Sequence, residues 1–167
     1  MLLVLLAVVG TGLVVAVVRA GAAPRSSPGG PGARPPAAMP TDLAAAQVLR
    51  SWDAQRSAAY ASGSVPMLRD LYVAGSGAGR SDVRVLRAWT RRGLRVEGMR
   101  TQVLGLQVLA RERDRLVLRV TDRLVAAAAV GAAGTTPLPR DRADTRVLTL
   151  RRGSDGAWRV AAVRPAG

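Results

Sequence analysis

The chain has 167 residues, with 25 basic side chains against 11 acidic ones and a formal net charge of +14. It contains neither Cys nor His, which excludes thiol catalysis, disulfide bonds, zinc sites built from Cys and His, and a Ser-His-Asp triad. We therefore expect no metal and no cofactor. Every basic residue is Arg, and both Lys and Phe are absent, which we interpret as the mutational bias of a GC-rich bacterial genome.

The positive charge still favours anionic lipid headgroups, phosphorylated glycans or nucleic acid as partners. Proteins that bind single-stranded nucleic acid place aromatic side chains among the basic ones, as platforms for the bases. This chain has only three Trp and two Tyr. We therefore expect no dedicated nucleic-acid binding.

Residues 2–18 carry no charged side chain. As a helix they would span about 26 Å, close to the thickness of a bilayer hydrocarbon core, about 30 Å. We predict that residues 1–19 form a transmembrane anchor in a bacterial cell membrane. A cleaved signal sequence is the alternative, because Ala20-Gly21-Ala22 has the small-x-small form of a signal-peptidase site.

The orientation of this anchor is open between two interpretations. Arg19, Arg25 and Arg34 follow the apolar segment and favour a cytoplasmic C-terminal side. The signal-like position of the segment favours an exported domain. We expect a single-pass protein whose domain is extracytoplasmic.

Residues 20–40 are dominated by Pro, Gly, Ala and Ser, so we predict a disordered tether. Its coil span would be about 25 Å, which keeps the following domain close to the bilayer. Residues 41–167 then have the size of one domain. A homodimer of this domain is left open.

The first half of this domain has helical patterning. A capping pair at Thr41-Asp42 starts a helix that ends near Gly63, and Ser64 caps a short second helix with Pro66 in its first turn. Val73–Arg80 is predicted to be a Gly-rich loop, and the third helix runs from Ser81 to about Gly93.

One side of the third helix carries a row of arginines. A row of this kind is usually a solvated face, but beside a membrane it would contact anionic headgroups. Its members are Arg80, Arg84, Arg87 and Arg91.

The pattern changes to alternation after Gly93. One strand includes Leu104, Leu106, Val108 and Ala110, and a polar turn at 111–114 leads into a second strand. Residues 131–143 are predicted to be a loop, Arg146–Arg152 a third strand, and Ser154-Asp155-Gly156 the turn into a fourth. The predicted class is α+β, with three helices packed on one face of a curved four-stranded antiparallel sheet.

Two segments resemble the nuclear transport factor two-like superfamily, which includes SnoaL-like cyclases and ketosteroid isomerase. Residues 48–76, VLRSWDAQRSAAYASGSVPMLRDLYVAGS, resemble the opening helices of that family, and residues 155–163, DGAWRVAAV, resemble its closing strand with an inward Trp. The resemblance implies a cone-like domain over most of 41–164. Anchored domains of this type occur in actinobacterial envelopes.

The resemblance also implies an interior pocket and a candidate catalytic group. Asp122 is in phase with Leu118, Val120 and Leu124, so its carboxylate would point into the cone. An inward Asp serves as general base in enzymes of the family; pairing with an Arg, or a place at the cone rim, is the alternative. The aromatic residues expected to line the pocket are Trp52, Tyr60, Tyr72 and Trp158.

Two functions follow from these features. The first is a membrane-tethered, non-enzymatic binding or assembly module of the cell envelope, whose partner is an envelope protein or an anionic lipid. The second is a cyclase- or isomerase-like enzyme that uses Asp122 on a small hydrophobic substrate.

Overall fold

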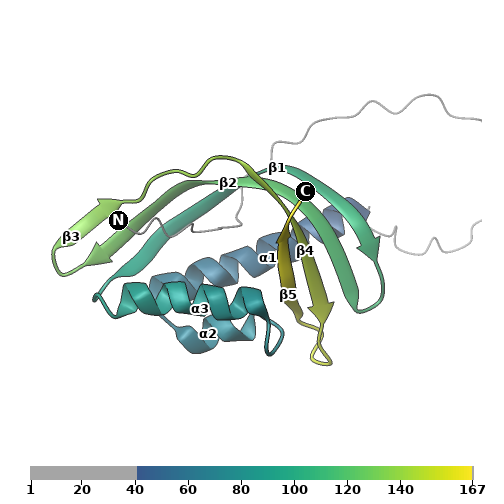
Figure 1. Ribbon diagram of the computed structural model, residues 1–167, viewed down its shortest axis with the longest axis horizontal. Helices are drawn as coiled ribbons and strands as arrows, with labels where there is room; N and C mark the ends of the chain where they lie inside the picture. The colour runs from purple at the N-terminus through teal and green to yellow at the C-terminus, as the bar shows by residue number, and fades with distance from the viewer. Residues whose placement is uncertain (1–40, 167) are drawn as a thin grey trace, which may run out of the picture.

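The computed structural model describes residues 41–166, so the predicted anchor (1–19) and tether (20–40) lie outside the described residues. Three helices come first: α1 (Thr41–Ser62), α2 (Val65–Asp70) and α3 (Gly77–Thr90). Five strands follow: β1 (Arg95–Arg111), β2 (Arg115–Gly131), β3 (Gly134–Pro137), β4 (Asp144–Arg152) and β5 (Trp158–Pro165). The helices lie on the concave side of a curved sheet (Figure 1), which confirms the α+β class.

No helix within the described range is long and apolar enough to cross a membrane.

The strands form one antiparallel sheet in the order β1-β2-β4-β5, with β3 paired to the end of β2. The prediction of four strands is wrong, because β3 lies inside the stretch 131–143 that was expected to be a loop. The chain reverses through Ala132-Ala133, and the first residue of β3, Gly134, has a φ of +108°, which favours glycine. Residues 135–137 can therefore return along residues 128–130 of β2.

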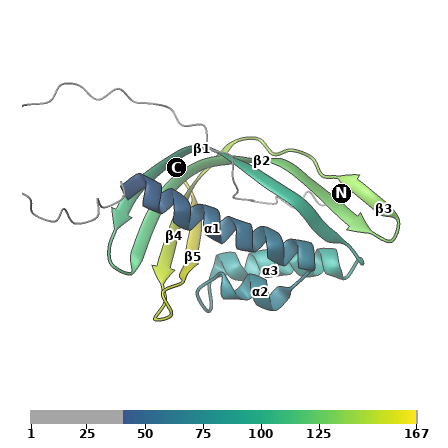
Figure 2. The ribbon, with the colours of Figure 1, turned by 180° about the vertical axis from the view of Figure 1, so that it is seen from behind.

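The curvature of the sheet comes from its longest pair of strands. Strands β1 and β2 have 17 residues each, and β1 changes register against β2 at several places, one of them near Gly98 (φ +62°). Such bulges bend a strand and increase its twist. The bent pair arches over α1, as Figure 2 shows from behind.

A register shift between Val103 and Gly105 explains why the predicted inward position of Leu104 is wrong. Leu104 was expected to share a face with Leu106, but its side chain is 48% exposed. The shift puts Leu104 out of phase with the buried residues of the strand.

The third helix begins earlier than predicted. The side chain of Ser76 accepts a hydrogen bond from the backbone N–H of Gly79 at 3.2 Å, and α3 starts at Gly77 rather than Ser81. The cap offsets the low helix propensity of two glycines in the first turn. The prediction of a loop over all of Val73–Arg80 is therefore wrong for its last four residues.

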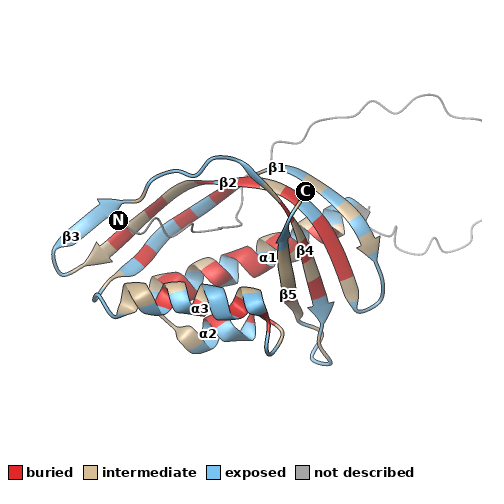
Figure 3. Cartoon of the chain, viewed as in Figure 1, coloured by how far each residue is buried: buried red, intermediate tan, exposed pale blue. Residues whose placement is uncertain are grey.

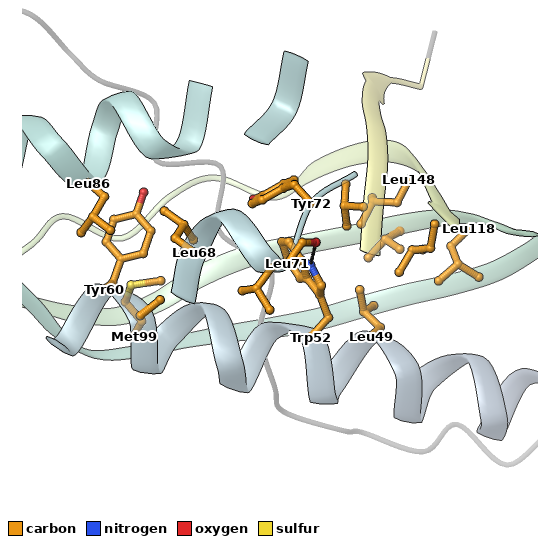
Figure 4. Packing of buried hydrophobic residues seen from close by; sticks show 14 of the residues in the cluster. Leu49, Trp52, Tyr60, Leu68, Leu71, Tyr72, Leu86, Met99, Leu118 and Leu148 are labelled. Atoms are coloured by element: carbon orange, nitrogen blue, oxygen red, sulfur yellow. Dashed lines mark hydrogen bonds between the residues drawn. The ribbon is translucent and has the colours of Figure 1, made fainter. Parts of the chain in front are cut away.

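The core lies between α1 and the concave face of the sheet (Figure 3). Leu49, Leu118 and Leu148 come from three separate elements and are at most 2% exposed. Burial of one such side chain stabilises the fold by about 1.5–3 kcal/mol. Figure 4 shows these residues together with Trp52 and Tyr72, whose rings meet edge to face with centroids 5.6 Å apart.

The segment after α2 covers the outer edge of β5. Val160 donates its backbone N–H to the carbonyl of Leu71 at 2.9 Å and accepts from the N–H of Val73 at 3.0 Å. Trp52 donates its indole N–H to the same Leu71 carbonyl at 2.9 Å. The connection between α2 and α3 is thereby fixed to both the sheet and α1.

We predict opposite effects for two glycines in the first turn of α3. A Cβ at Gly79 would lie 2.8 Å from Cβ and Cγ of Tyr72, whereas a Cβ at Gly77 would lie 3.7 Å from the flexible end of Arg80. Gly79→Ala should lower the free energy of unfolding by about 1–3 kcal/mol. Gly77→Ala should be neutral or raise it by up to about 1 kcal/mol. Urea denaturation measures both, and equal effects would contradict the close packing of α3 on Tyr72.

Candidate functional site

A buried ion pair joins α1 to α3. The guanidinium of Arg56, 2% exposed, donates from Nε to Oδ2 of Asp82 at 2.7 Å and from Nη2 to Oδ1 at 2.6 Å. The hydroxyls of Tyr60 and Tyr72 donate to the same carboxylate, each at 2.7 Å. Asp82 therefore accepts hydrogen bonds from three side chains, two on α1 and one on the segment after α2.

The charge state of this network follows from its contacts. Burial alone would raise the pKa of Asp82, but the charge and hydrogen bonds of Arg56, followed by the two tyrosine hydroxyls, hold it below its ordinary value. Burial raises the pKa of Tyr60 and of Tyr72 above the ordinary tyrosine range, so both hydroxyls remain donors. Removal of one partner from such a buried pair costs about 3–5 kcal/mol, so this network is structural.

Three of the four aromatic residues predicted to line a pocket are buried in the structure. Trp52, Tyr60 and Tyr72 are buried, and both tyrosine hydroxyls are bound to Asp82 rather than presented to a ligand. Trp158 is half-buried and packs against the core at the start of β5. Their role as pocket lining stays a prediction.

Asp122 is buried inside the cone, at 1% exposure. Its Oδ1 forms an ion pair with Arg146 of the neighbouring strand β4, the contact that the sequence left open as the alternative to catalysis. Burial raises the pKa of Asp122 to about 6, although Arg146 acts to lower it. The residue thus combines an inward position with a permanent cationic partner.

Asp53 is a second interior carboxyl that the sequence analysis missed. It is 5% exposed, and its Oδ1 has no hydrogen-bond partner within residues 41–166. Burial raises the pKa of Asp53 to about 8; Arg56 opposes this rise and the charge of Asp122 adds to it. The signal in the sequence was its spacing, because Leu49, Asp53, Arg56 and Tyr60 form one stripe along a helix.

Other buried polar atoms near these carboxyls also lack protein partners in the described part of the chain. They are Nη1 of Arg56, Oγ1 of Thr101 and Oδ2 of Asp122. Buried polar groups are normally hydrogen-bonded to protein or to ordered water. The interior between α1 and the sheet therefore contains several polar atoms whose hydrogen-bonding capacity is not met by the described residues.

Among residues 41–166, no three Asp or Glu side chains come together as a metal site.

A groove on the surface is lined mainly by arginines. It lies between the end of α2, the start and outer face of α3, and the β4–β5 hairpin, with a volume of about 1000 Å³. Figure 1 shows these three parts side by side. Its lining holds one aspartate, Asp70, and eight arginines: Arg69, Arg80, Arg84, Arg87, Arg91, Arg151, Arg152 and Arg159. We call this feature the arginine groove.

The arginine groove contains all four arginines of the predicted helical row. The other four come from α2 and the hairpin, and sequence reasoning missed them. The doublet Arg151-Arg152 before the predicted turn was visible in the sequence. The position of this doublet opposite α3 depends on how the whole sheet curves, which the local sequence pattern does not show.

No protein-family model matches the chain, and no curated protein matches its sequence. Solved structures do match. The intermembrane space region of chloroplast protein ARC6 has a TM-score of 0.53 at 14% identity, over 78% of this chain and 99% of that one. Aln2 from a Streptomyces species has a TM-score of 0.50 at 15% identity, over 77% of this chain and 94% of that one. At these identities the likeness shows the fold alone, and that fold agrees with the predicted α+β domain with a curved antiparallel sheet.

Asp53 should make the protein less stable as the pH rises. Its pKa is 3.8 ordinarily and about 8 in the fold. Between these values the folded chain holds a proton that the unfolded chain has released, so the free energy of unfolding falls with rising pH, by up to about 1.4 kcal/mol per pH unit. Asp53→Asn should remove this part of the slope.

The measurement is urea denaturation of both proteins at pH 5, 6, 7 and 8. Wild type should lose stability across this range, and Asp53→Asn should lose distinctly less. The charged residues that act on the pKa of Asp53 are the same in both proteins; they are Arg56, Asp82, Asp122 and Arg146. Parallel curves for the two proteins would show that Asp53 is ionised throughout.

Proposed function

We propose that the chain is a membrane-tethered, non-enzymatic binding module of a bacterial cell envelope, whose folded domain meets an anionic partner through the arginine groove. The observation that carries this proposal is the convergence of eight arginines from three separate segments on one hollow. Composition alone spreads arginines over a surface. Here the fold concentrates them where a ligand of opposite charge gains most.

The tether supports a location beside a membrane. Residues 2–18 are uncharged and residues 20–40 are rich in Pro and Gly, so an anchored chain would hold the domain within about 25 Å of the bilayer. A fold of this kind is found in a similar setting, because the ARC6 region of like fold is described as lying in an intermembrane space. This is an analogy of fold and location only.

A non-enzymatic role agrees with the state of the interior carboxyls. A general base has to come within hydrogen-bond reach of the proton that it takes from a substrate. Asp122 is 1% exposed and paired with Arg146. Most arginines of the arginine groove, in contrast, are exposed to solvent.

Fractionation of cells that express the full chain tests the tether. The protein should stay in the membrane pellet after a carbonate wash, and deletion of residues 2–18 should move it to the supernatant, because only this segment is apolar enough to hold it in lipid. Arg84→Gln/Arg87→Gln should remain in the pellet and serves as the control. Recovery of the unprocessed full chain in the soluble fraction would contradict the tether.

A second candidate function is an isomerase- or cyclase-like activity with Asp122 as the general base. Two observations favour it: the inward position of Asp122, and the unpartnered oxygens of Asp122 and Asp53 in the described interior. A carboxyl whose pKa is about 6 is suited to proton transfer near neutral pH.

Hydrogen–deuterium exchange at the α-carbon of a β,γ-unsaturated ketone measures such proton transfer directly. Under the binding-module proposal, the full chain and Asp122→Asn should give the same background rate. A rate that is high in wild type and lost in Asp122→Asn, with circular dichroism melts showing both proteins folded, would establish the enzyme and reject the non-enzymatic role.

A further inference from the structure

The arginines of the groove differ in what they already bind. Arg159 pairs with Asp155 at 2.6 Å, and Arg151 lies 3.7 Å from Asp114. Arg80 and Arg152 have no ion pair but donate to the backbone carbonyls of Gly75 and Gly156. A second group lines the groove with neither an ion pair nor a side-chain hydrogen bond to any residue between 41 and 166. This group consists of Arg69, Arg84, Arg87 and Arg91. Four guanidinium groups therefore face the groove with their charge uncompensated by described carboxylates.

Two of these four groups lie on α3, and Arg91 is the C-cap residue that directly follows it. The spacing from Arg84 to Arg87 and Arg91 places them on one side of the helix, over a length of about 10 Å. A guanidinium presents a planar fork of donors that matches the oxygens of a phosphate. Because the chain has no Lys at all, the choice of Arg carries no weight here, and the argument rests on the convergence alone.

Part of the lining of the groove is apolar. The apolar lining consists of Tyr72, Val73, Ala74 and Val83, of which Ala74 is exposed, Val73 is half-buried, and Tyr72 and Val83 are buried. Apolar surface next to a cluster of cations suits a ligand that has both a charged and an apolar part. A small inorganic anion would contact only the arginines and would leave this apolar lining in water.

Nucleic acid fits this lining poorly. Bases bind to exposed aromatic faces, and the only aromatic side chain in the lining is Tyr72, which is 8% exposed and engaged with Trp52 and Asp82. The volume of about 1000 Å³ instead corresponds to one small-molecule ligand.

We propose that the arginine groove binds one molecule of an anionic phospholipid, with its phosphate on the α3 arginines and Arg69 and its apolar part on Val73, Ala74 and Val83. This inference rests on the proposed binding function, which it narrows from an anionic partner to an amphiphile. It adds a requirement that the wider proposal does not have: the acyl part must contribute to affinity.

The test uses the full chain in nanodiscs of phosphatidylcholine and calorimetric titration with dihexanoyl phosphatidic acid, with empty nanodiscs as the baseline. Glycerol 3-phosphate and inorganic phosphate carry the same anionic group without the acyl chains. We expect the phosphatidic acid to bind at least about tenfold more tightly than either, because burial of a few methylene groups supplies that factor.

A matched pair of variants locates the site. Arg84→Gln/Arg87→Gln should weaken the binding of phosphatidic acid by about 25-fold, at about fivefold for each cation. Arg119→Gln/Arg123→Gln removes the same charge from exposed positions on β2 outside the groove and should change binding less than twofold. Val73→Ser should weaken the binding of phosphatidic acid by about fivefold and leave the binding of glycerol 3-phosphate unchanged.

The outcomes separate the two proposals. Equal affinity for phosphatidic acid and glycerol 3-phosphate would overturn the phospholipid inference but leave an anion-binding groove. Equal weakening by the two arginine pairs would show attraction by net charge alone and overturn the site itself. Absence of binding to every phosphate probe would reject both the inference and the role given to the groove.

Discussion

Arg56 and Asp82 meet in the interior of the domain, where the guanidinium is 2% exposed and both of its bonded nitrogens lie within 2.7 Å of carboxylate oxygens. Two charges removed from water this far are stabilising only if their remaining hydrogen-bonding capacity is also met. The hydroxyls of Tyr60 and Tyr72 meet it for the carboxylate. These hydrogen bonds therefore fix α1, α3 and the segment after α2 relative to one another.

The surface properties of the domain depend on that arrangement. Asp82 and Val83 face inward on α3, and so Arg84 and Arg87 are held on the opposite side, beside the β4–β5 hairpin. The backbone hydrogen bonds of Val160 to Leu71 and Val73 fix the same hairpin strand to the α2–α3 connection. The groove is thus formed by rigid elements, which limits the conformational entropy that a ligand has to offset on binding.

Much of this fold was predictable because the sequence contains local signals of known meaning. The cap at Ser64, Pro66 in the short helix and the alternation in β2 and β4 all depend on near neighbours in the chain. The misses concern long-range geometry. Strand β3 is defined by its pairing with β2, which a local pattern does not show. The bulge that exposes Leu104 likewise depends on the partner strand.

The site was predictable to the same extent. The inward position of Asp122 and the arginine row on α3 came from simple periodicity. The partner Arg146 and the interior Asp53 did not, since charged residues are expected at the surface unless a specific contact compensates their burial. The hairpin arginines opposite α3 could be placed only by the curvature of the whole sheet.

The two edge strands of the sheet, β1 and β5, differ in what pairs with their outer edges. The backbone of β5 is occupied by Leu71 and Val73 at Val160, whereas β1, over its 17 residues, pairs only with β2 among the strands of residues 41–166. A long open strand invites pairing with another chain. Arg95, Arg100 and Arg111 are exposed along it, so two identical chains approaching edge to edge would bring like charges together. Self-association by strand addition is thereby disfavoured most at low ionic strength, and salt should relax that protection.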